Sequence, residues 1–203
     1  MNLPNKITTF RMGCVIVIIF LLLFPWESCH VAMPVLFGGV RLEYLIAFVI
    51  FVVASFSDFL DGYIARKYHL VTTYGKFMDP IADKLLIDSL LIILTCSRLD
   101  TKVPLIVAVV MIARDLVVDA VKLIAASKNR IVAANIWGKL KTVAQMIAIA
   151  FVLLNDWPFS YFDGSVNVSV LLCYLAGAFS LLSMIVYTYQ NREVFKDESE
   201  KAE

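Results

Sequence analysis

Charged residues, histidines and paired cysteines are all scarce in this sequence. Of its 203 residues, 17% are Asp, Glu, Lys or Arg, whereas 61% are hydrophobic. Because ordinary soluble domains carry about one quarter charged residues, this composition argues against a soluble domain and indicates an integral membrane protein. The four cysteines stand singly, without a CxxC pair, which disfavours a zinc site or a disulfide framework. The net charge of +1 says nothing about partners by itself, and we expect no nucleic-acid partner.

No cleavable signal peptide and no internal repeat is evident in the sequence either. The opening residues, "MNLPNKITTFRMGCVIVIIFLLLFPW", combine a charged start with an apolar run, but no small-residue cleavage site follows them. The first apolar run is therefore expected to stay in the protein as a helix. Because no repeat or low-complexity linker divides the chain, we expect one membrane-embedded domain over residues 1–192 and a polar tail over residues 193–203.

Apolar windows of about twenty residues predict helices long enough to cross a bilayer. Six such windows predict an all-α integral membrane fold of six transmembrane helices, with both chain ends on the same side. The segment before them, "PNKITTFR" at residues 4–11, is expected to form a short N-terminal interfacial helix, with a simple lead-in as the alternative. The windows are residues 11–26, 42–66, 79–97, 103–126, 136–154 and 165–189.

Lys and Arg are unevenly distributed between the connections. They gather in the N-terminal segment, the second and fourth connections and the tail, whereas "NDWPFSYFDGS" between the fifth and sixth windows contains neither. Positively charged connections remain on the cytoplasmic side of a membrane. We therefore expect a multi-pass protein of the cytoplasmic membrane whose two termini both face the cytoplasm.

Four aspartates lie where the second window ends and the third begins, in "DFLDGYIARKYHLVTTYGKFMDPIAD". Asp58 and Asp61 are three residues apart and share one helical face, and Asp79 and Asp83, four residues apart, share another. The short connection between the two helices brings these faces together. Four carboxylates at distances of several ångströms repel one another by roughly 1 kcal/mol per pair or more, so the cluster requires bound cations.

The residues between these aspartates suit a phosphate ester held through metals. Oxygen ligands without His or Cys favour Mg²⁺, Mn²⁺ or Ca²⁺, and four carboxylates suffice for two such ions. Gly62 and Ala65 leave room for a ligand beside the helix, and Arg66 offers donors suited to phosphate. Taken singly, two of these features have a structural alternative. Asp79 before Pro80 is also typical of a helix N-cap, and Arg66 is also typical of the basic residues that keep a helix end on the cytoplasmic side of a membrane.

A known signature matches this stretch. The chain resembles the CDP-alcohol phosphotransferases, membrane enzymes of phospholipid synthesis, at every constrained position of their signature. The matching positions are Asp58, Asp61, Gly62, Ala65, Arg66, Gly75, Asp79 and Asp83. The resemblance implies a six-helix fold, usually a homodimer, with a polar cavity open to the cytoplasm and two divalent cations, Mg²⁺ or Mn²⁺.

The resemblance also implies a role for individual residues. Asp58, Asp61 and Asp79 are expected to be metal ligands. Asp83 is expected to contact metal as well and to act as the catalytic base for the incoming hydroxyl. The residues expected to bind the cytidine diphosphate group are Asn5, Thr8, Asp58, Gly62, Ala65, Arg66 and Gly75.

Outside the signature, the chain is similar to the phosphatidylglycerophosphate synthases within this family. The similar segments are "LPNKITTFR", "ARDLVVDAVKLIA" and "GKLKT", although Asp115 stands where Glu is expected and "VK" where "LR" is expected. The similarity implies transfer of the phosphatidyl group from CDP-diacylglycerol to glycerol 3-phosphate, with CMP as the second product.

A phosphorylated acceptor requires cations, and the fourth and fifth windows contain them. Arg114 lies about halfway along the fourth window, where a lone arginine needs an anion; pairing with Asp115 or Asp119 is the structural alternative to a ligand. The lysines at the start of the fifth window also fit the positive-inside rule. The residues predicted to bind the acceptor phosphate are Arg11, Arg114, Lys139 and Lys141.

Other functions remain open at this stage. Within the family, the acceptor could instead be phosphatidylglycerol, giving cardiolipin, or serine or an inositol phosphate. A cation-coupled transporter would place its carboxylates near the bilayer midplane on repeat-related helices, whereas these acids lie at a helix end. One further carboxylate, Asp88, is expected to pair with Lys84 one helical turn earlier.

Overall fold

The computed structural model describes residues 3–67, 73–97, 99, 101–128, 136–161 and 167–192, and within them the protein is all-helical. The predicted tail, residues 193–203, lies outside the described residues. Short 3₁₀ turns occupy the connections: η1 (Trp26–Cys29), η2 (Phe37–Gly39) and η3 (Phe159–Tyr161). The long helices are α1 (Leu3–Leu23), α2 (Leu42–Lys67), α3 (Thr73–Thr95), α4 (Leu105–Ser127), α5 (Ile136–Leu153) and α6 (Val168–Gln190).

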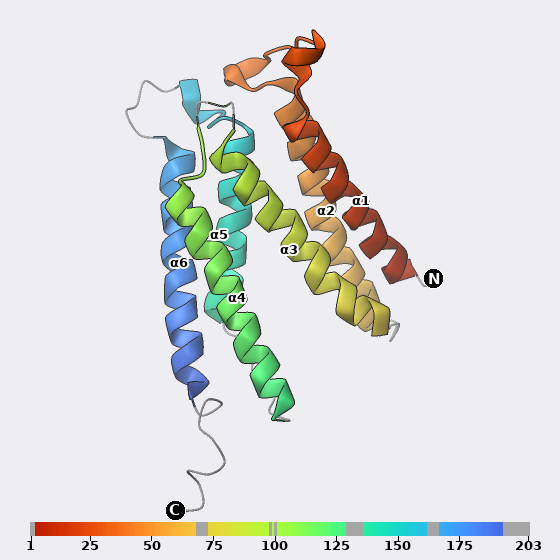
Figure 1. Ribbon diagram of the computed structural model, residues 1–203, viewed down its shortest axis with the longest axis vertical. Coiled ribbons are helices and arrows are strands. Elements are labelled where there is room, and N and C mark those ends of the chain that lie inside the picture. Colours follow the sequence, from red (N-terminus) through yellow and green to blue (C-terminus); the bar gives the residue numbers. More distant parts are fainter. Residues whose placement is uncertain are drawn as a thin grey trace, which may run out of the picture.

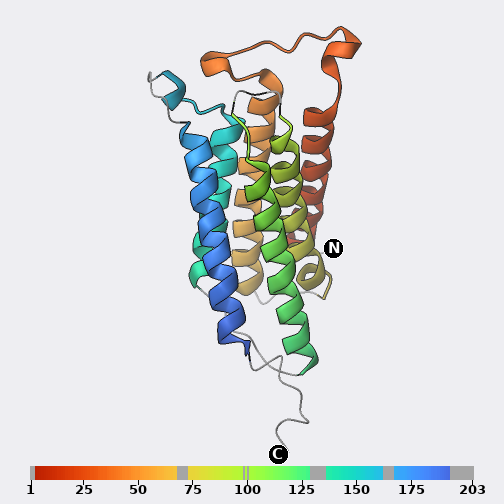
Figure 2. The ribbon, with the colours of Figure 1, turned by 60° about the vertical axis from the view of Figure 1, so that its left-hand side comes forward.

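The six described helices run alternately up and down in one bundle (Figure 1). One end of the bundle holds the start of α1, the junction of α2 and α3, the end of α4, the start of α5 and the end of α6. We call it the acidic end because Asp58 and Asp79 lie there. The opposite, distal end carries the connection between α1 and α2 and the segment that follows α5, and Figure 2 shows the same alternation from the side.

The helices form two groups. Helices α1, α2 and α3 pack together, and α6 packs against both α4 and α5. Contacts between the groups are fewer and involve α3 with α4, and α5 with α2 and α3. A seam between α2 and α3 on one side and α4 and α5 on the other therefore runs through the bundle.

Apolar side chains cover the outside of the bundle as well as its interior. Leu86, Leu90 and Leu94, spaced one turn apart on α3, lie in a buried core to which all six described helices contribute. On the outside, Leu116 and Leu123 of α4 are 66% and 72% exposed, an arrangement that suits hydrocarbon better than water. In the described part of the chain, three segments are long and apolar enough to cross a membrane, in α1, α5 and α6. The fold is consistent with a membrane-embedded protein.

The start of α1 differs from the prediction. No separate interfacial helix covers residues 4–11, because α1 runs without a break from Leu3 to Leu23. Pro4 lies in the first turn, where its missing N–H is tolerated, and no later proline interrupts the helix. Thr8 and Arg11 are 1% and 0% exposed, so they face neighbouring helices rather than lipid headgroups.

The start of α3 also differs from the prediction. The helix begins at Thr73, before the predicted start at residue 79, and contains Pro80 in its interior. Asp79 is therefore not an N-cap, and that structural alternative is wrong. Asp79 and Asp83 instead lie on a continuous helix, one turn apart.

Polar contacts hold the connections at the distal end. The guanidinium of Arg41 contacts carboxylate oxygens of Glu27 and Glu43 at 3.0 and 2.6 Å. Burial alone would lower the pKa of Arg41, but the hydrogen bonds and charges of these two carboxylates raise it. Asn155 accepts from the Thr101 N–H and donates to the Gly38 carbonyl, each at 3.2 Å. These contacts lie at the distal end of the bundle, opposite the acidic end.

Candidate active site

The first group of predicted site residues gathers around Arg11 of α1. Its guanidinium forms an ion pair with Asp58 of α2, and its Nη2 lies 3.8 Å from Oδ1 of Asp79 on α3. Thr8, one turn earlier on α1, donates from Oγ1 to the same Asp79 oxygen at 2.6 Å. Arg11 is completely buried, whereas the side chains of Asp58 and Asp79 are 38% and 43% exposed. In this Arg11 cluster, one buried cation therefore orients two carboxylates that remain open to solvent.

A second group gathers around Arg114 in the other half of the bundle. Its Nη1 donates to Oδ1 of Asp115 at 2.8 Å, and its Nη2 donates to Oγ of Ser183 on α6 at 2.5 Å. Lys141 of α5 donates to the second oxygen of Asp115 at 2.7 Å. A Cβ at Gly138 would lie 3.3 Å from Nη2 of Arg114, so the glycine leaves room for the guanidinium. In this Arg114 cluster, two buried cations share one carboxylate.

Asp83 lies between the two clusters. It follows Asp79 by one turn of α3, and it is within electrostatic range of Arg11 in one half of the bundle and of Lys141 in the other. The next residue, Lys84, forms an ion pair with Asp119 of α4. Asp83 is thus within electrostatic range of a cation from each cluster.

The predicted pair between Lys84 and Asp88 is wrong. Lys84 contacts Asp119 on the neighbouring helix instead, and Oδ1 of Asp88 is buried without a hydrogen-bond partner among the described residues. An i, i+4 pair on one helix contributes only about 0.2–0.5 kcal/mol, so a carboxylate on a facing helix competes with it easily. Lys84 and Lys141 are within electrostatic range of Asp88, but its Oδ1 accepts no hydrogen bond from the described residues.

The structure places the remaining predicted residues as follows. Asn5 is buried on α1 and Gly75 is buried on α3, whereas Lys139 is exposed at the start of α5. Arg11 lies in one cluster and Arg114 with Lys141 in the other, so the four predicted acceptor-phosphate residues are not gathered at one point. The side chains of four predicted residues on α2 lie outside the described part of the structure: Asp61, Gly62, Ala65 and Arg66.

The donors of the Arg11 cluster fit hard divalent cations. Asp58 and Asp79 are brought to one guanidinium from two helices, and each is more than one third exposed. A metal site with carboxylate oxygens and no His or Cys among its ligands favours Mg²⁺ or Mn²⁺. Within the described residues no three His, Cys, Asp or Glu side chains form a metal-sized group; the predicted set also includes Asp61, whose side chain is not among them.

Sequence reasoning missed several polar residues in the apolar part of the helices. Ser183 was not singled out, although it contacts Arg114. Gln145 is completely buried on α5, and Ser180 on α6. The one available signal was the presence of a polar residue inside an apolar window, and a serine there is too common to be informative. The bridging position of Asp115 was considered only as one of two possible partners for Arg114.

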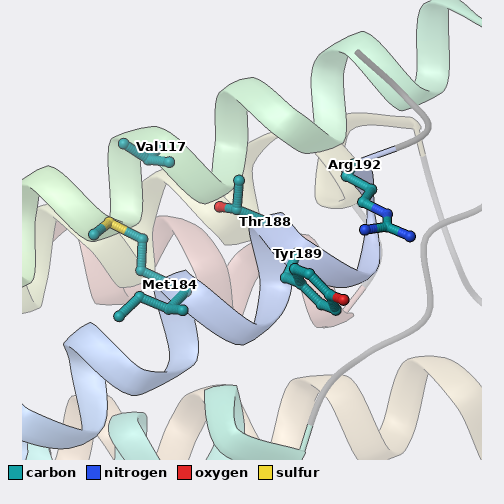
Figure 3. Close-up of a pocket in the computed structure, with 6 residues that line it drawn as sticks. Val117, Met184, Thr188, Tyr189 and Arg192 are labelled. Atoms are coloured by element: carbon teal, nitrogen blue, oxygen red, sulfur yellow. The ribbon is translucent and has the colours of Figure 1, made fainter. Parts of the chain in front are cut away.

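An open groove of about 570 Å³ lies between α4 and α6. Figure 3 shows its lining, in which the guanidinium carbon of Arg192 lies 4.9 Å from the ring centroid of Tyr189. The groove contains no residue of the Arg11 or Arg114 cluster and is not the candidate active site. Its lining residues are Val117, Met184, Ile185, Thr188, Tyr189 and Arg192.

The fold is an all-helical bundle consistent with a membrane protein, with carboxylates gathered around Arg11 in one half and cations gathered around Asp115 in the other. The sequence model of the CDP-alcohol phosphatidyltransferase family matches residues 1–187, a range that includes both clusters. The chain belongs to this family.

Curated relatives of the chain carry more particular names. A Bacillus subtilis (strain 168) protein named CDP-diacylglycerol–glycerol-3-phosphate 3-phosphatidyltransferase is 37% identical over 197 residues, covering 96% of this chain and 97% of that protein. A Mycoplasma pneumoniae protein of the same name is 36% identical over 209 residues, covering 96% and 89%. A cardiolipin synthase (CMP-forming) of Oryza sativa subsp. japonica is 36% identical over 150 residues, covering 68% and 46%.

Proposed function

We propose that this protein transfers the phosphatidyl group of CDP-diacylglycerol to glycerol 3-phosphate, giving phosphatidylglycerophosphate and CMP. The observation that carries the proposal is a pair of carboxylates, Asp58 and Asp79, in one half of the bundle and a pair of buried cations, Arg114 and Lys141, in the other, with Asp83 within electrostatic range of Arg11 and Lys141. Membership of the family and the names of the bacterial relatives support the same reaction.

The donor binds at the Arg11 cluster in this proposal. Asp58, Asp61, Asp79 and Asp83 hold two divalent cations, Mg²⁺ or Mn²⁺, which supply positive charge to the donor's pyrophosphate when bound. Arg11 and Thr8 of α1 hold the carboxylates of Asp58 and Asp79 in place through an ion pair and a hydrogen bond. The residues assigned to the cytidine diphosphate group are Asn5, Thr8, Asp58, Gly62, Ala65, Arg66 and Gly75.

Asp83 is the general base. Its place between Arg11 and Lys141 puts it where the donor and the acceptor phosphate meet. It takes the proton of the primary hydroxyl of glycerol 3-phosphate, and the hydroxyl oxygen forms a bond to the phosphorus that carries the diacylglycerol. The bond from that phosphorus to the bridging pyrophosphate oxygen breaks, and CMP leaves with the electron pair.

Arg114 and Lys141 bind the phosphate of the acceptor. As whole residues they are 9% and 3% exposed, and among the described residues the carboxylate that both of them contact is that of Asp115. Two buried cations at one point are complementary to a phosphate dianion. Lys139, exposed on the same helix as Lys141, attracts the phosphate at the entrance, and Arg11 adds positive charge from the donor side.

The proposal includes the membrane topology. All six helices of a single domain over residues 1–192 cross the cytoplasmic membrane, with the acidic end and both termini in the cytoplasm and with two copies forming a homodimer. A site at the cytoplasmic end of the helices is accessible both to a lipid donor from the bilayer and to a water-soluble acceptor from the cytoplasm.

Cardiolipin synthesis is the second candidate, because the rice relative carries that name. In that case the acceptor would be phosphatidylglycerol, which offers no terminal phosphate to Arg114 and Lys141. The paired cations therefore favour glycerol 3-phosphate.

A panel of acceptors tests the proposed function. Purified protein with CDP-diacylglycerol and Mg²⁺ is expected to release CMP when glycerol 3-phosphate is added, and not with phosphatidylglycerol, serine or inositol phosphate. Release with one of the other acceptors but not with glycerol 3-phosphate would overturn the acceptor assignment. No release with any acceptor would overturn the reaction class.

A further inference from the structure

Four residues that lie deeper in the bundle than the two clusters, counted along their helices from the acidic end, have buried polar atoms without partners in the described part of the chain. Gln145 of α5 is 0% exposed, and in the described part of the chain neither Oε1 nor Nε2 of its amide has a hydrogen-bond partner. The same holds for Oγ of Ser55, Oδ1 of Asp88 and Oγ of Ser180, on three other helices. Leaving a buried polar atom unpaired costs about 1–3 kcal/mol. We call these four residues the inner polar layer, and such a layer is stable when it contacts water or a polar ligand.

The helix register places this layer next to the reacting groups. Both α3 and α5 begin at the acidic end, and the rise of 1.5 Å per residue puts Asp88 about 7.5 Å deeper than Asp83 and Gln145 about 6 Å deeper than Lys141. Gln145 and Lys141 are four residues apart and share one face of α5. Asp88 is also within electrostatic range of Lys141. The layer therefore lies directly behind the proposed acceptor site.

We propose that the amide of Gln145 binds the secondary hydroxyl of the acceptor and makes the site selective for a glycerol phosphate. The inference rests on the proposed function, in which the acceptor's phosphate lies at Arg114 and Lys141 and its primary hydroxyl at Asp83. The secondary hydroxyl is on the carbon between those two groups. A side-chain amide both donates and accepts a hydrogen bond, so one hydroxyl can satisfy Nε2 or Oε1 of Gln145, and water in the layer can satisfy the rest.

A purely structural role for Gln145 makes a different prediction. A residue that only fills space would affect all acceptors alike when replaced. If Gln145 recognises the secondary hydroxyl, replacing it slows turnover of acceptors that have this hydroxyl. An acceptor that lacks the hydroxyl makes no hydrogen bond to the amide and therefore loses none.

The experiment compares glycerol 3-phosphate with 3-hydroxypropyl phosphate, which keeps the primary hydroxyl and the phosphate but lacks the secondary hydroxyl. The wild-type protein is expected to have a kcat/KM for the analogue about 10- to 100-fold below that for glycerol 3-phosphate. In Gln145→Leu, kcat/KM for glycerol 3-phosphate is expected to fall to near that of the analogue, so that the ratio approaches one. Met146→Leu, a volume-conserving change at the adjacent position, is the matched control and is expected to keep the wild-type ratio.

Two results would overturn the assignment. One is a wild-type protein that uses both acceptors equally well, and the other is a Gln145→Leu variant that is slower but keeps the wild-type ratio. If Gln145→Leu does not yield folded protein, the unbranched Gln145→Met variant allows the same comparison. Failure of the proposed function is a distinct outcome, since the wild-type protein would then turn over neither of the two acceptors.

Discussion

The carboxylate of Asp115 contacts two buried cations, and its charge can be removed with little change of shape by Asp115→Asn. Arg114 and Lys141 contact its two oxygens at 2.8 and 2.7 Å, and the three side chains are between 4% and 14% exposed. Removing one partner of a buried ion pair typically costs about 3–5 kcal/mol, because the remaining charge stays buried without compensation. For a chain of this length that free energy corresponds to a fall in the unfolding temperature of roughly 6–20 °C.

Thermal unfolding of the detergent-solubilised protein measures this loss, and Asp119→Asn is the matched control. Asp119 also pairs with a lysine, Lys84, but these two side chains are 38% and 35% exposed. Pairs open to solvent contribute at most about 1 kcal/mol, so the control is expected to lose no more than a few degrees. Equal losses in the two variants would refute the claim that Asp115 compensates buried charge.

Adding inorganic phosphate tests whether the cations contacted by Asp115 also bind the phosphate of the acceptor. In Asp115→Asn, the two cations lose the carboxylate that both of them contact, so a bound phosphate replaces the missing charge and stabilises the native state by mass action. Adding phosphate is expected to raise the unfolding temperature of Asp115→Asn more than that of the wild type. Equal shifts in both proteins would show that phosphate does not bind at Arg114 and Lys141.

Three further outcomes are expected. Asp83→Asn abolishes turnover while the unfolding temperature stays near that of the wild type; an active variant would rule out Asp83 as the base. Gly138→Ala places a Cβ 3.3 Å from Nη2 of Arg114 and is expected to raise the KM for glycerol 3-phosphate several-fold with little effect on the KM for CDP-diacylglycerol, which initial-rate kinetics measures. Chelation with EDTA is expected to stop CMP release, and Mg²⁺ or Mn²⁺ to restore it; release that continues in EDTA would contradict the two-cation proposal.

The positions of the helices were largely predictable, because long apolar windows are a strong and local signal. The second and fifth windows, residues 42–66 and 136–154, agree with α2 and α5 to within a residue. The beginning of α1 was not predictable in this way. Residues 4–11 were expected to be interfacial because they come before the first window, but Arg11 is buried against Asp58, a residue of another helix, and a local pattern carries no information about such a partner.

The candidate site was predictable where its residues are close in sequence. Asp58 and Asp79 were expected to approach each other because a short connection joins their helices, and the structure brings both to Arg11. The contacts between distant helices were not predictable. Lys84 had a carboxylate one turn away at Asp88, but it pairs with Asp119 on α4, because antiparallel packing presents that carboxylate to it. Ser183 contacts Arg114 because α6 packs against α4, a contact between helices that are far apart in the sequence.

The identity of the lipid product tests the proposed function most directly. Purified protein is incubated with CDP-diacylglycerol, glycerol 3-phosphate and Mg²⁺. Mass spectrometry identifies and quantifies the lipid products, and the amount of CMP released is measured in parallel. The expected result is one phosphatidylglycerophosphate formed for each CMP released. CMP without this lipid, or with phosphatidic acid or cardiolipin in its place, would contradict transfer of the phosphatidyl group to glycerol 3-phosphate.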